Sequence, residues 1–212
     1  LKWVVKATDD AADHLQSSIC FNDLGIVGCD KKRLHIVTFP NLGGVMIPGS
    51  CVKAMSDLMD KGATVRWDER TLSVELGDTL YITRQVSGDY MNVKPAIPKL
   101  HDSPWSIDAS LIAKLITTLP ASQSAPWIDV VGNGEQLAIK TRDDGNEIDV
   151  DMPCNASGHF RCSQSGLHDM LSGFKGEQKL EVHEVPTGKG MSHRLCIRGD
   201  DRIALLSGME VR

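Results

Sequence analysis

The sequence predicts an α+β fold made of a repeated unit, in which one helix is followed by a run of antiparallel strands. Helical stripes of apolar residues begin near residues 2, 51, 108 and 165. This spacing gives a repeat of roughly 50–57 residues, which indicates a duplicated supersecondary unit. Short runs of alternating polarity follow each stripe and are bounded by turn residues. With 212 residues the chain can form two such domains, each containing two repeats.

The first half begins with a predicted helix over residues 1–18, which contain no Pro or Gly. Its apolar face would hold Trp3, Val4, Ala7, Ala11 and Leu15. Strands are expected at 24–29, 34–39 and 43–47. A second helix is expected at 51–60, ended by Gly62, and is followed by strands at 63–67, 71–76 and 79–85.

The segment 94–104 contains Pro95, Pro98 and Pro104 and has no helical period. We therefore place a domain boundary there and expect one domain at 1–100 and another at 101–212.

The second half repeats the order of the first. Asp108 can cap a helix that runs to residue 119 and ends before Pro120. The apolar stripe of this helix is Leu111, Ile112, Leu115, Ile116 and Leu119. A fourth helix is expected after Ser165. The expected strands lie at 127–131, 135–140, 147–152, 158–162, 179–185, 193–198 and 202–206.

Composition excludes several classes of protein. Apolar residues make up 41% and charged residues 24%, which is typical of a globular domain. No apolar run approaches the roughly 20 residues that span a bilayer. The net charge is −5, and all of it comes from residues 101–212, with 11 basic and 16 acidic side chains. A conventional nucleic-acid binder would be basic, so any DNA contact must be local and weak.

No side-chain constellation indicates catalysis, a metal site or a cofactor. The six cysteines form no Cys-x-x-Cys pair, and the seven histidines show no His-x-x-x-His spacing. Scattered cysteines of this kind are expected to be buried free thiols in a reducing compartment, so we expect a cytoplasmic protein. Because the sequence has no nucleophile–base or metal-ligand spacing, we expect that it is not an enzyme. The cysteines are Cys20, Cys29, Cys51, Cys154, Cys162 and Cys196.

Three stretches are candidates for a functional site. The first runs from Gly28 to His35 and carries Asp-Lys-Lys-Arg between two predicted strands. The second runs from Val86 to Tyr90 and on to Pro98, and the third is the final strand at 202–207. The structural alternative is that Leu34 and Leu206 are core residues and that the charged run is a solvated turn.

Together these stretches resemble the middle and C-terminal domains of the bacterial DNA polymerase III β subunit, the sliding clamp. Asp30, Arg33 and Leu34 match the family signature Ala-Thr-Asp-Gly-His-Arg-Leu. The stretch from Ser87 to Pro98 resembles the passage Glu-Gly-x-Phe-Pro-Asp-Tyr to Leu-Pro. The final strand takes the place of Val-Val-Met-Pro-Met-Arg-Leu. The resemblance implies a DNA clamp fold, with helices on the inner face and sheets outside.

The resemblance also implies a pocket that binds short peptides from DNA polymerase, the clamp loader and other partners. The pocket would be built from Leu15, Cys29, Arg33, Leu34, Pro98, Ala204 and Leu206, with Lys31 and Lys32 at its mouth. An apolar cleft with a polar edge is typical of ligand sites. Lysines in place of the family's Gly-His, and Ser207-Gly208-Met209 in place of its Met-Pro-Met, suggest a divergent clamp, such as one from a phage.

Double-stranded DNA would be held without sequence preference by lysines on or beside the helices. The candidates are Lys2, Lys6, Lys53, Lys61, Lys114 and Lys175, each of which could instead be a solvating surface charge.

Two questions stay open from the sequence. The chain begins at Leu1 rather than Met and shows two domains where bacterial clamp chains have three, so it is either a fragment, which we favour, or a two-domain clamp closing a ring as a homo-oligomer. The alternative function is a clamp-like interaction domain, such as a decoy that sequesters partners without encircling DNA.

Overall fold

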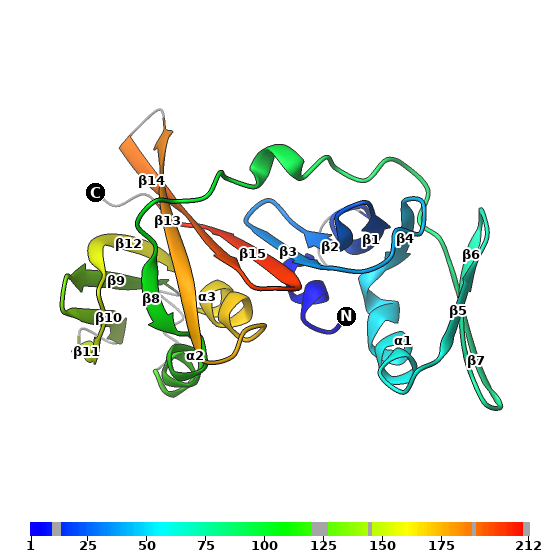
Figure 1. Ribbon diagram of the computed structural model, residues 1–212, viewed down its shortest axis with the longest axis horizontal. Helices are drawn as coiled ribbons and strands as arrows, with labels where there is room; N and C mark the ends of the chain where they lie inside the picture. Colours follow the sequence, from blue (N-terminus) through cyan, green and yellow to red (C-terminus); the bar gives the residue numbers. More distant parts are fainter. Residues whose placement is uncertain (10–13, 120–126, 144–145, 188–189, 210–212) are drawn as a thin grey trace. The chain divides into compact units, whose positions relative to one another are not determined.

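The computed structural model describes residues 1–9, 14–119, 127–143, 146–187 and 190–209 (Figure 1). The chain divides into two compact units, unit 1 (Leu1–Ala96) and unit 2 (Ile97–Arg212). The division falls within the proline-containing segment 94–104. Both units combine helical segments with antiparallel sheets, so the predicted α+β class is confirmed.

Unit 1 contains a four-stranded antiparallel arrangement in the order β4-β1-β2-β3. Its strands are β1 (Ser18–Asn22), β2 (Gly25–Cys29), β3 (Arg33–Val37) and β4 (Val45–Pro48). All five residues of β2 are buried, as are the first four of β1. Strands buried on both faces carry continuous apolar runs rather than alternating ones, as here at Ile26 and Val27.

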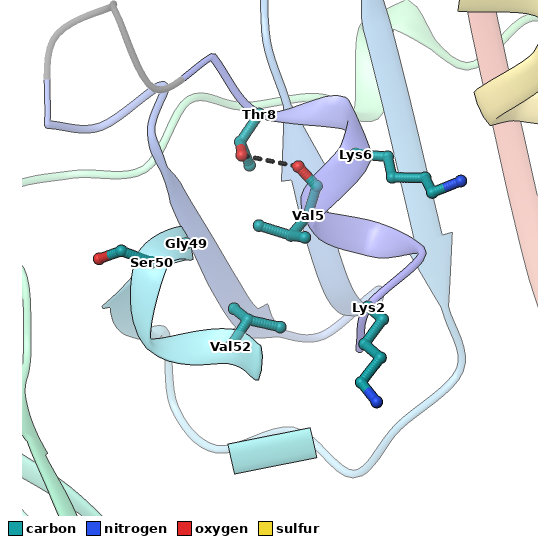
Figure 2. A pocket seen from close by; sticks show the side chains of 7 residues that line it. All are labelled: Lys2, Val5, Lys6, Thr8, Gly49, Ser50 and Val52. Atoms are coloured by element: carbon teal, nitrogen blue, oxygen red, sulfur yellow. Dashed lines mark hydrogen bonds between the residues drawn. The ribbon is translucent and has the colours of Figure 1, made fainter. Parts of the chain in front are cut away.

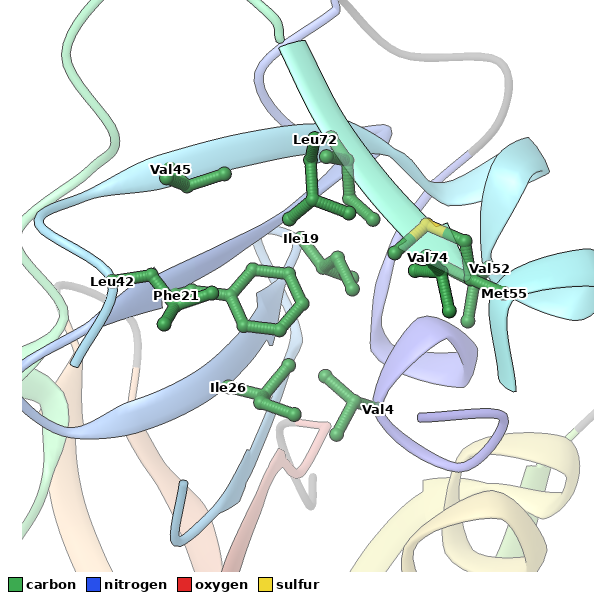
Figure 3. Close-up of a cluster of buried hydrophobic side chains, with 11 residues drawn as sticks. Val4, Ile19, Phe21, Ile26, Leu42, Val45, Val52, Met55, Leu72 and Val74 are labelled. Atoms are coloured by element: carbon green, nitrogen blue, oxygen red, sulfur yellow. The ribbon is translucent and has the colours of Figure 1, made fainter. Parts of the chain in front are cut away.

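The rest of unit 1 is a helix followed by a three-stranded meander. A short 3-10 turn at Gly49–Cys51 leads into α1 (Val52–Met59), and β5 (Thr64–Trp67), β6 (Thr71–Leu76) and β7 (Thr79–Arg84) follow in that order. Val52 and Met55 of α1 and Leu72 and Val74 of β6 are fully buried in one core with Phe21 (Figure 3). The predicted helix and the three predicted strands are confirmed.

The predicted helix over residues 1–18 is wrong for the residues that the structure describes; residues 10–13, including Ala11, lie outside them. Among residues 1–9 and 14–17, the one regular element is the 3-10 helix η1 (Val4–Ala7), and Ser18 already belongs to β1. The Thr8 hydroxyl donates to the Val5 carbonyl at 2.7 Å, an example of the side-chain bonds with which Thr and Ser compete with helix formation.

Unit 2 contains two antiparallel four-stranded arrangements, ordered β11-β10-β9-β12 and β8-β13-β14-β15. Helices α2 (Ala109–Thr118) and α3 (Gln164–Leu171) pack against each other beside these strands (Figure 1). The strands are β8 (Trp105–Asp108), β9 (Trp127–Asn133), β10 (Gln136–Asp143), β11 (Asn146–Pro153), β12 (Ser157–Ser163), β13 (Glu177–Thr187), β14 (Gly190–Arg198) and β15 (Arg202–Ser207).

Both helices of unit 2 begin at a side-chain cap. Asp108 accepts a hydrogen bond from the Leu111 N–H at 2.9 Å, so the predicted cap is confirmed. The cap of α3 is Ser163, which accepts from the Gly166 N–H at 3.1 Å, so this helix begins at Gln164 and not after Ser165 as expected. The predicted stop at Pro120 lies outside the described residues.

Two strands, β1 and β8, were not predicted from the sequence. Strand β1 follows directly on the segment that was expected to be helical. Strand β8 has only four residues between the proline-containing segment and the α2 cap. None of the helices in the described ranges has the length and apolar character needed to cross a bilayer.

Candidate functional site

Asp30 fixes the turn between β2 and β3. Its Oδ1 accepts hydrogen bonds from the backbone N–H groups of Lys32 and Arg33, both at 2.6 Å. The backbone N–H of Asp30 donates to the Arg33 carbonyl at 3.0 Å. The Arg33 guanidinium lies against the same carboxylate, with Nε 2.9 Å and Nη2 2.8 Å from Oδ2. The charged stretch is therefore a rigid turn closed by its own side chains.

Arg33 also connects this turn to the N-terminal segment of unit 1. Its Nη2 donates to the Thr8 carbonyl at 3.2 Å. Asp30 and Arg33 are largely enclosed, with side chains 10% and 23% exposed, whereas Lys31 and Lys32 are exposed at the tip of the turn. The turn thus exposes the ammonium groups of Lys31 and Lys32, while the Asp30–Arg33 pair beneath them is largely enclosed.

The residues that flank the turn are buried. Cys29 is 8% and Leu34 is 3% exposed. Burial, with a smaller contribution from Asp30, raises the pKa of the Cys29 thiol to about 12. The thiol is therefore protonated at neutral pH, and it donates to the Asp30 carbonyl at 3.1 Å. Cys29 is not a nucleophile under these conditions.

The second sequence marker lies over the same part of unit 1. The Tyr90 hydroxyl donates to the Val27 carbonyl at 3.3 Å, and burial raises the pKa of that hydroxyl. Gly88 adopts φ 122° and lies against Leu15, because a Cβ on Gly88 would be 3.4 Å from Leu15 Cδ2. Leu15 is half-buried. Leu15 and the Ser87–Tyr90 stretch are thus neighbours in the fold.

The three remaining residues of the predicted pocket belong to unit 2. Pro98 is half-buried, and its carbonyl accepts a hydrogen bond from Arg198 at 2.5 Å. Ala204 and Leu206 lie on β15 and are 0% and 2% exposed. Leu206 packs directly over α3, because a Cβ on Gly166 would be only 2.9 Å from Leu206 Cδ1. Gly166 thus leaves the space that Leu206 occupies.

Two of the predicted DNA-facing lysines, Lys2 and Lys6, line a pocket of about 600 Å³ in unit 1. The pocket lies between η1 and the start of α1, and both ammonium groups extend away from Gly49 and Ser50 (Figure 2). Lys2 Nζ lies 2.5 Å from Asp57 Oδ1 of α1, and this pairing raises the pKa of Lys2. Part of the Lys2 charge is therefore already neutralised.

The other candidate lysines differ in their placement. Lys114 is exposed on α2. Lys61 and Lys175 are exposed in the turns that follow α1 and α3. The side chain of Lys53 lies outside the described part of the structure.

Sequence reasoning missed a histidine-lined groove of about 450 Å³ in unit 2. His101, His159, His183 and His193 all line it, together with Trp105 and Glu184. The four histidines come from separate segments, so no local spacing could reveal them. Within the described ranges, no three His, Cys, Asp or Glu side chains form a group that could hold a metal ion.

No protein-family model and no curated protein matches the sequence. Solved structures, however, match its fold. The chain aligns with Caulobacter crescentus pol III beta at a TM-score of 0.79 and 12% identity, covering 99% of this chain and 64% of that one. A DNA polymerase sliding clamp from Pseudomonas aeruginosa gives a TM-score of 0.80 and 12% identity, with 99% and 64% covered.

A third match is the sliding clamp of Bartonella birtlesii bound to griselimycin, with a TM-score of 0.79, 14% identity, and 99% and 63% of the two chains covered. The chain therefore spans less than two thirds of the length of these structures. At such low identity they establish the fold alone. The resemblance drawn from the three sequence markers is confirmed at that level: this chain has the sliding-clamp fold.

Proposed function

We propose that this chain acts as a sliding clamp, or as the two-domain part of one, which holds partner proteins on duplex DNA. The observation that carries the proposal is the clamp fold itself, which extends over 99% of the chain. Under this proposal, residues 1–100 correspond to the middle domain of bacterial clamps and residues 101–212 to the C-terminal domain. Its role is tethering in the cytoplasm, without catalysis.

The DNA contact in this proposal is electrostatic and independent of sequence. Lys2, Lys6, Lys53, Lys61, Lys114 and Lys175 would attract phosphates without reading bases. The net charge of −5 keeps this attraction weak, which suits a protein that moves along DNA. Encirclement would require a closed ring of several clamp domains, built from more than one chain.

The partner contact in this proposal is a short peptide segment of a polymerase or clamp loader. Buried Cys29, Leu34, Ala204 and Leu206 would form the apolar base of the contact. The half-buried Leu15, Arg33 and Pro98 would touch the peptide directly. Exposed Lys31 and Lys32 would attract acidic residues at its edge.

The test is a titration of a fluorescent polymerase-derived clamp-binding peptide, read by anisotropy. Lys31→Glu combined with Lys32→Glu should weaken binding about tenfold, which corresponds to 1.4 kcal/mol. These side chains are exposed, so the variant should fold normally. Leu34→Ala should weaken binding further, but its burial also affects stability.

Lys61→Glu is the matched control, because Lys61 is an exposed lysine of unit 1 in a different turn. It should leave peptide affinity unchanged. Failure of the unmodified chain to bind the peptide, or an equal loss of affinity in the Lys31→Glu/Lys32→Glu variant and in Lys61→Glu, would contradict the proposed contact.

The acidic net charge and the Lys2–Asp57 pair favour a second candidate, a clamp-like interaction domain that binds partners but not DNA. The two candidates are distinguished by titrating a labelled DNA duplex, first at low salt and then at increasing salt concentrations. Affinity that falls steeply with salt supports the clamp. Peptide binding without any duplex binding supports the interaction domain.

Ring formation is tested by light scattering over a range of concentrations. A particle near three times the 23.1 kDa chain mass would support a closed trimer of two-domain chains. A monomer at every concentration would contradict ring closure by these 212 residues alone.

A further inference from the structure

Unit 2 contains a buried carboxylate, Glu181 on β13, that is 4% exposed. Its two oxygens have different partners. Oε1 accepts from Arg198 Nε at 2.8 Å, and Oε2 lies 2.9 Å from His183 Nε2. Burying a carboxylate costs free energy unless it is paired and hydrogen-bonded. The two partners of Glu181 meet this requirement, one at each carboxylate oxygen.

Both partners of Glu181 reach the same neighbouring segment, Ile97–Ser103, which we term the connector. Arg198 Nη2 donates to the Pro98 carbonyl at 2.5 Å. The His183 ring meets the His101 ring edge-on, with centroids 5.1 Å apart and planes at 85°. One carboxylate thus supports attachments at two points of the connector, three residues apart.

We propose that Glu181, His183 and Arg198 form an anchor that fixes the connector on β13 and β14 and thereby positions Pro98. The attachment of the connector concerns the fold of unit 2 alone. The positioning of Pro98 rests on the proposed function, because Pro98 is a residue of the proposed peptide contact. Glu181 and Arg198 are positioning residues in this scheme and need not touch the peptide.

The chemistry of the connector explains why an anchor of this kind is needed. Pro98 has no backbone N–H, so its carbonyl is the only backbone group there that can form a hydrogen bond. Lys99 is exposed and Leu100 is 78% exposed, so neither side chain holds the connector by burial. Between Pro98 and His101 the connector is therefore held by the attachments at these two residues.

Arginine is suited to this role for a geometric reason. Its planar guanidinium binds the carboxylate through Nε and the carbonyl through Nη2 at the same time. A lysine ammonium keeps the charge but lacks this fixed fork, so Arg198→Lys should release Pro98 while leaving a cation beside Glu181. It is the most selective variant for the anchor.

The anchor is tested first by limited digestion with trypsin, with cleavage after Lys99 followed by mass spectrometry. Arg198→Lys and Glu181→Gln should raise the cleavage rate at Lys99 about tenfold, the change expected for loss of a charge-assisted hydrogen bond. Cleavage at Lys31 and Lys32, exposed in unit 1, is the internal control and should not change. Equal Lys99 rates in wild type and variants would overturn the anchor.

Glu181→Gln could destabilise unit 2, so a third variant leaves the buried carboxylate intact. His101→Ala removes the contact with the His183 ring and the hydrogen bond that His101 Nδ1 accepts from the Ser103 N–H at 3.1 Å, and it should give a smaller increase in Lys99 cleavage. If Lys99 is cleaved at the wild-type rate in both His101→Ala and Arg198→Lys, the proposal fails whatever Glu181→Gln does.

The same variants then enter the peptide titration. Arg198→Lys should weaken the peptide several-fold, while duplex affinity, which does not depend on Pro98, stays the same. Equal peptide affinities in wild type and Arg198→Lys would overturn the positioning of Pro98. Absence of peptide binding in wild type would overturn both the proposed function and the positioning of Pro98 for a peptide. The Lys99 cleavage rates would still test whether the anchor holds the connector.

Discussion

The indole ring of Trp3 stacks on the imidazole ring of His35, with centroids 4.2 Å apart and planes inclined by only 6°. The Nδ1 atom of His35 also lies 2.9 Å from the Trp3 carbonyl oxygen. His35 is fully buried on β3, and Trp3 immediately precedes η1. These two contacts hold the N-terminal segment of unit 1 against β3, next to the turn that Asp30 closes.

Trp3→Ala should therefore destabilise unit 1. Loss of a large, half-buried aromatic side chain and its ring contact is expected to lower the free energy of unfolding by about 2–3 kcal/mol. The measurement is urea unfolding followed by circular dichroism. Trp67→Ala is the matched control, because Trp67 is 47% exposed and should cost less than about 1 kcal/mol. An equal loss of unfolding free energy in both variants would show that the Trp3–His35 stack does not stabilise unit 1.

Gly28→Ala should disturb the same contact region from the other side. A Cβ on Gly28 would lie 2.3 Å from the Val4 carbonyl oxygen, so the backbone of η1 would have to move. We expect a loss of roughly 2 kcal/mol or more, in the range for overpacked cores. Hydrogen exchange should show faster exchange of the backbone amides of η1.

Gly199→Ala is the control for this substitution. The nearest atom to a Cβ there is a ring carbon of Phe174 at 3.3 Å, and a side chain can shift slightly. Its cost should stay below about 1 kcal/mol. A Gly28→Ala variant as stable as Gly199→Ala would contradict the close packing of β2 on η1.

The elements that were predictable from sequence are those that local chemistry determines. Helix α2 has its cap at Asp108 and a full apolar stripe, and β6 alternates in polarity over the predicted residues. The N-terminal segment was mispredicted because its conformation depends on contacts distant in sequence. His35 lies 32 residues from Trp3, and Gly28 is 24 residues from Val4.

The candidate site shows the same limit. The sequence indicated that Asp30, Arg33 and Leu34 belong together, but not that Asp30 closes the turn or that Arg33 reaches the Thr8 carbonyl. It also gave no sign of the Glu181 anchor, since Pro98 and Arg198 are 100 residues apart. Such long-range polar contacts have no local periodicity to reveal them.

His193 should make the stability of unit 2 depend on pH. Burial lowers its pKa below the ordinary value of 6.5; Glu184 acts to raise the pKa, and His159 lowers it further. Nδ1 of His193 is buried without a hydrogen-bond partner among the described residues. The unfolded chain therefore binds more protons than the folded chain just below pH 6.5, and stability falls as pH drops through that window.

The measurement is the urea midpoint of unfolding between pH 7.5 and pH 5. His193→Gln cannot titrate, so its midpoint should change less with pH than that of wild type. Asp129 does not confound this window. Burial acts to raise the pKa of Asp129, but Arg161 and His159 outweigh it and hold the pKa below 3.8, so this carboxylate titrates at lower pH. Parallel pH profiles for wild type and His193→Gln would contradict the prediction.

Asp57→Asn should strengthen the proposed association with DNA. Asp57 neutralises Lys2 across 2.5 Å, so the substitution releases one ammonium group and removes one negative charge beside the predicted DNA-facing lysines. Duplex affinity at low salt should rise several-fold. If Lys2 then contacts a phosphate, the slope of log affinity against log salt should steepen by about 0.9.

Asp23→Asn provides a closely matched control. Asp23 pairs with Lys94 at 2.5 Å, and the two pairs have similar exposure, 57% and 53% for Lys2 and Asp57 against 56% and 57% for Lys94 and Asp23. The net charge changes equally in both variants, but Lys94 is not one of the lysines predicted to face DNA. If the two variants bind duplex equally well, the gain comes from net charge alone, and Lys2 has no particular place in the DNA contact.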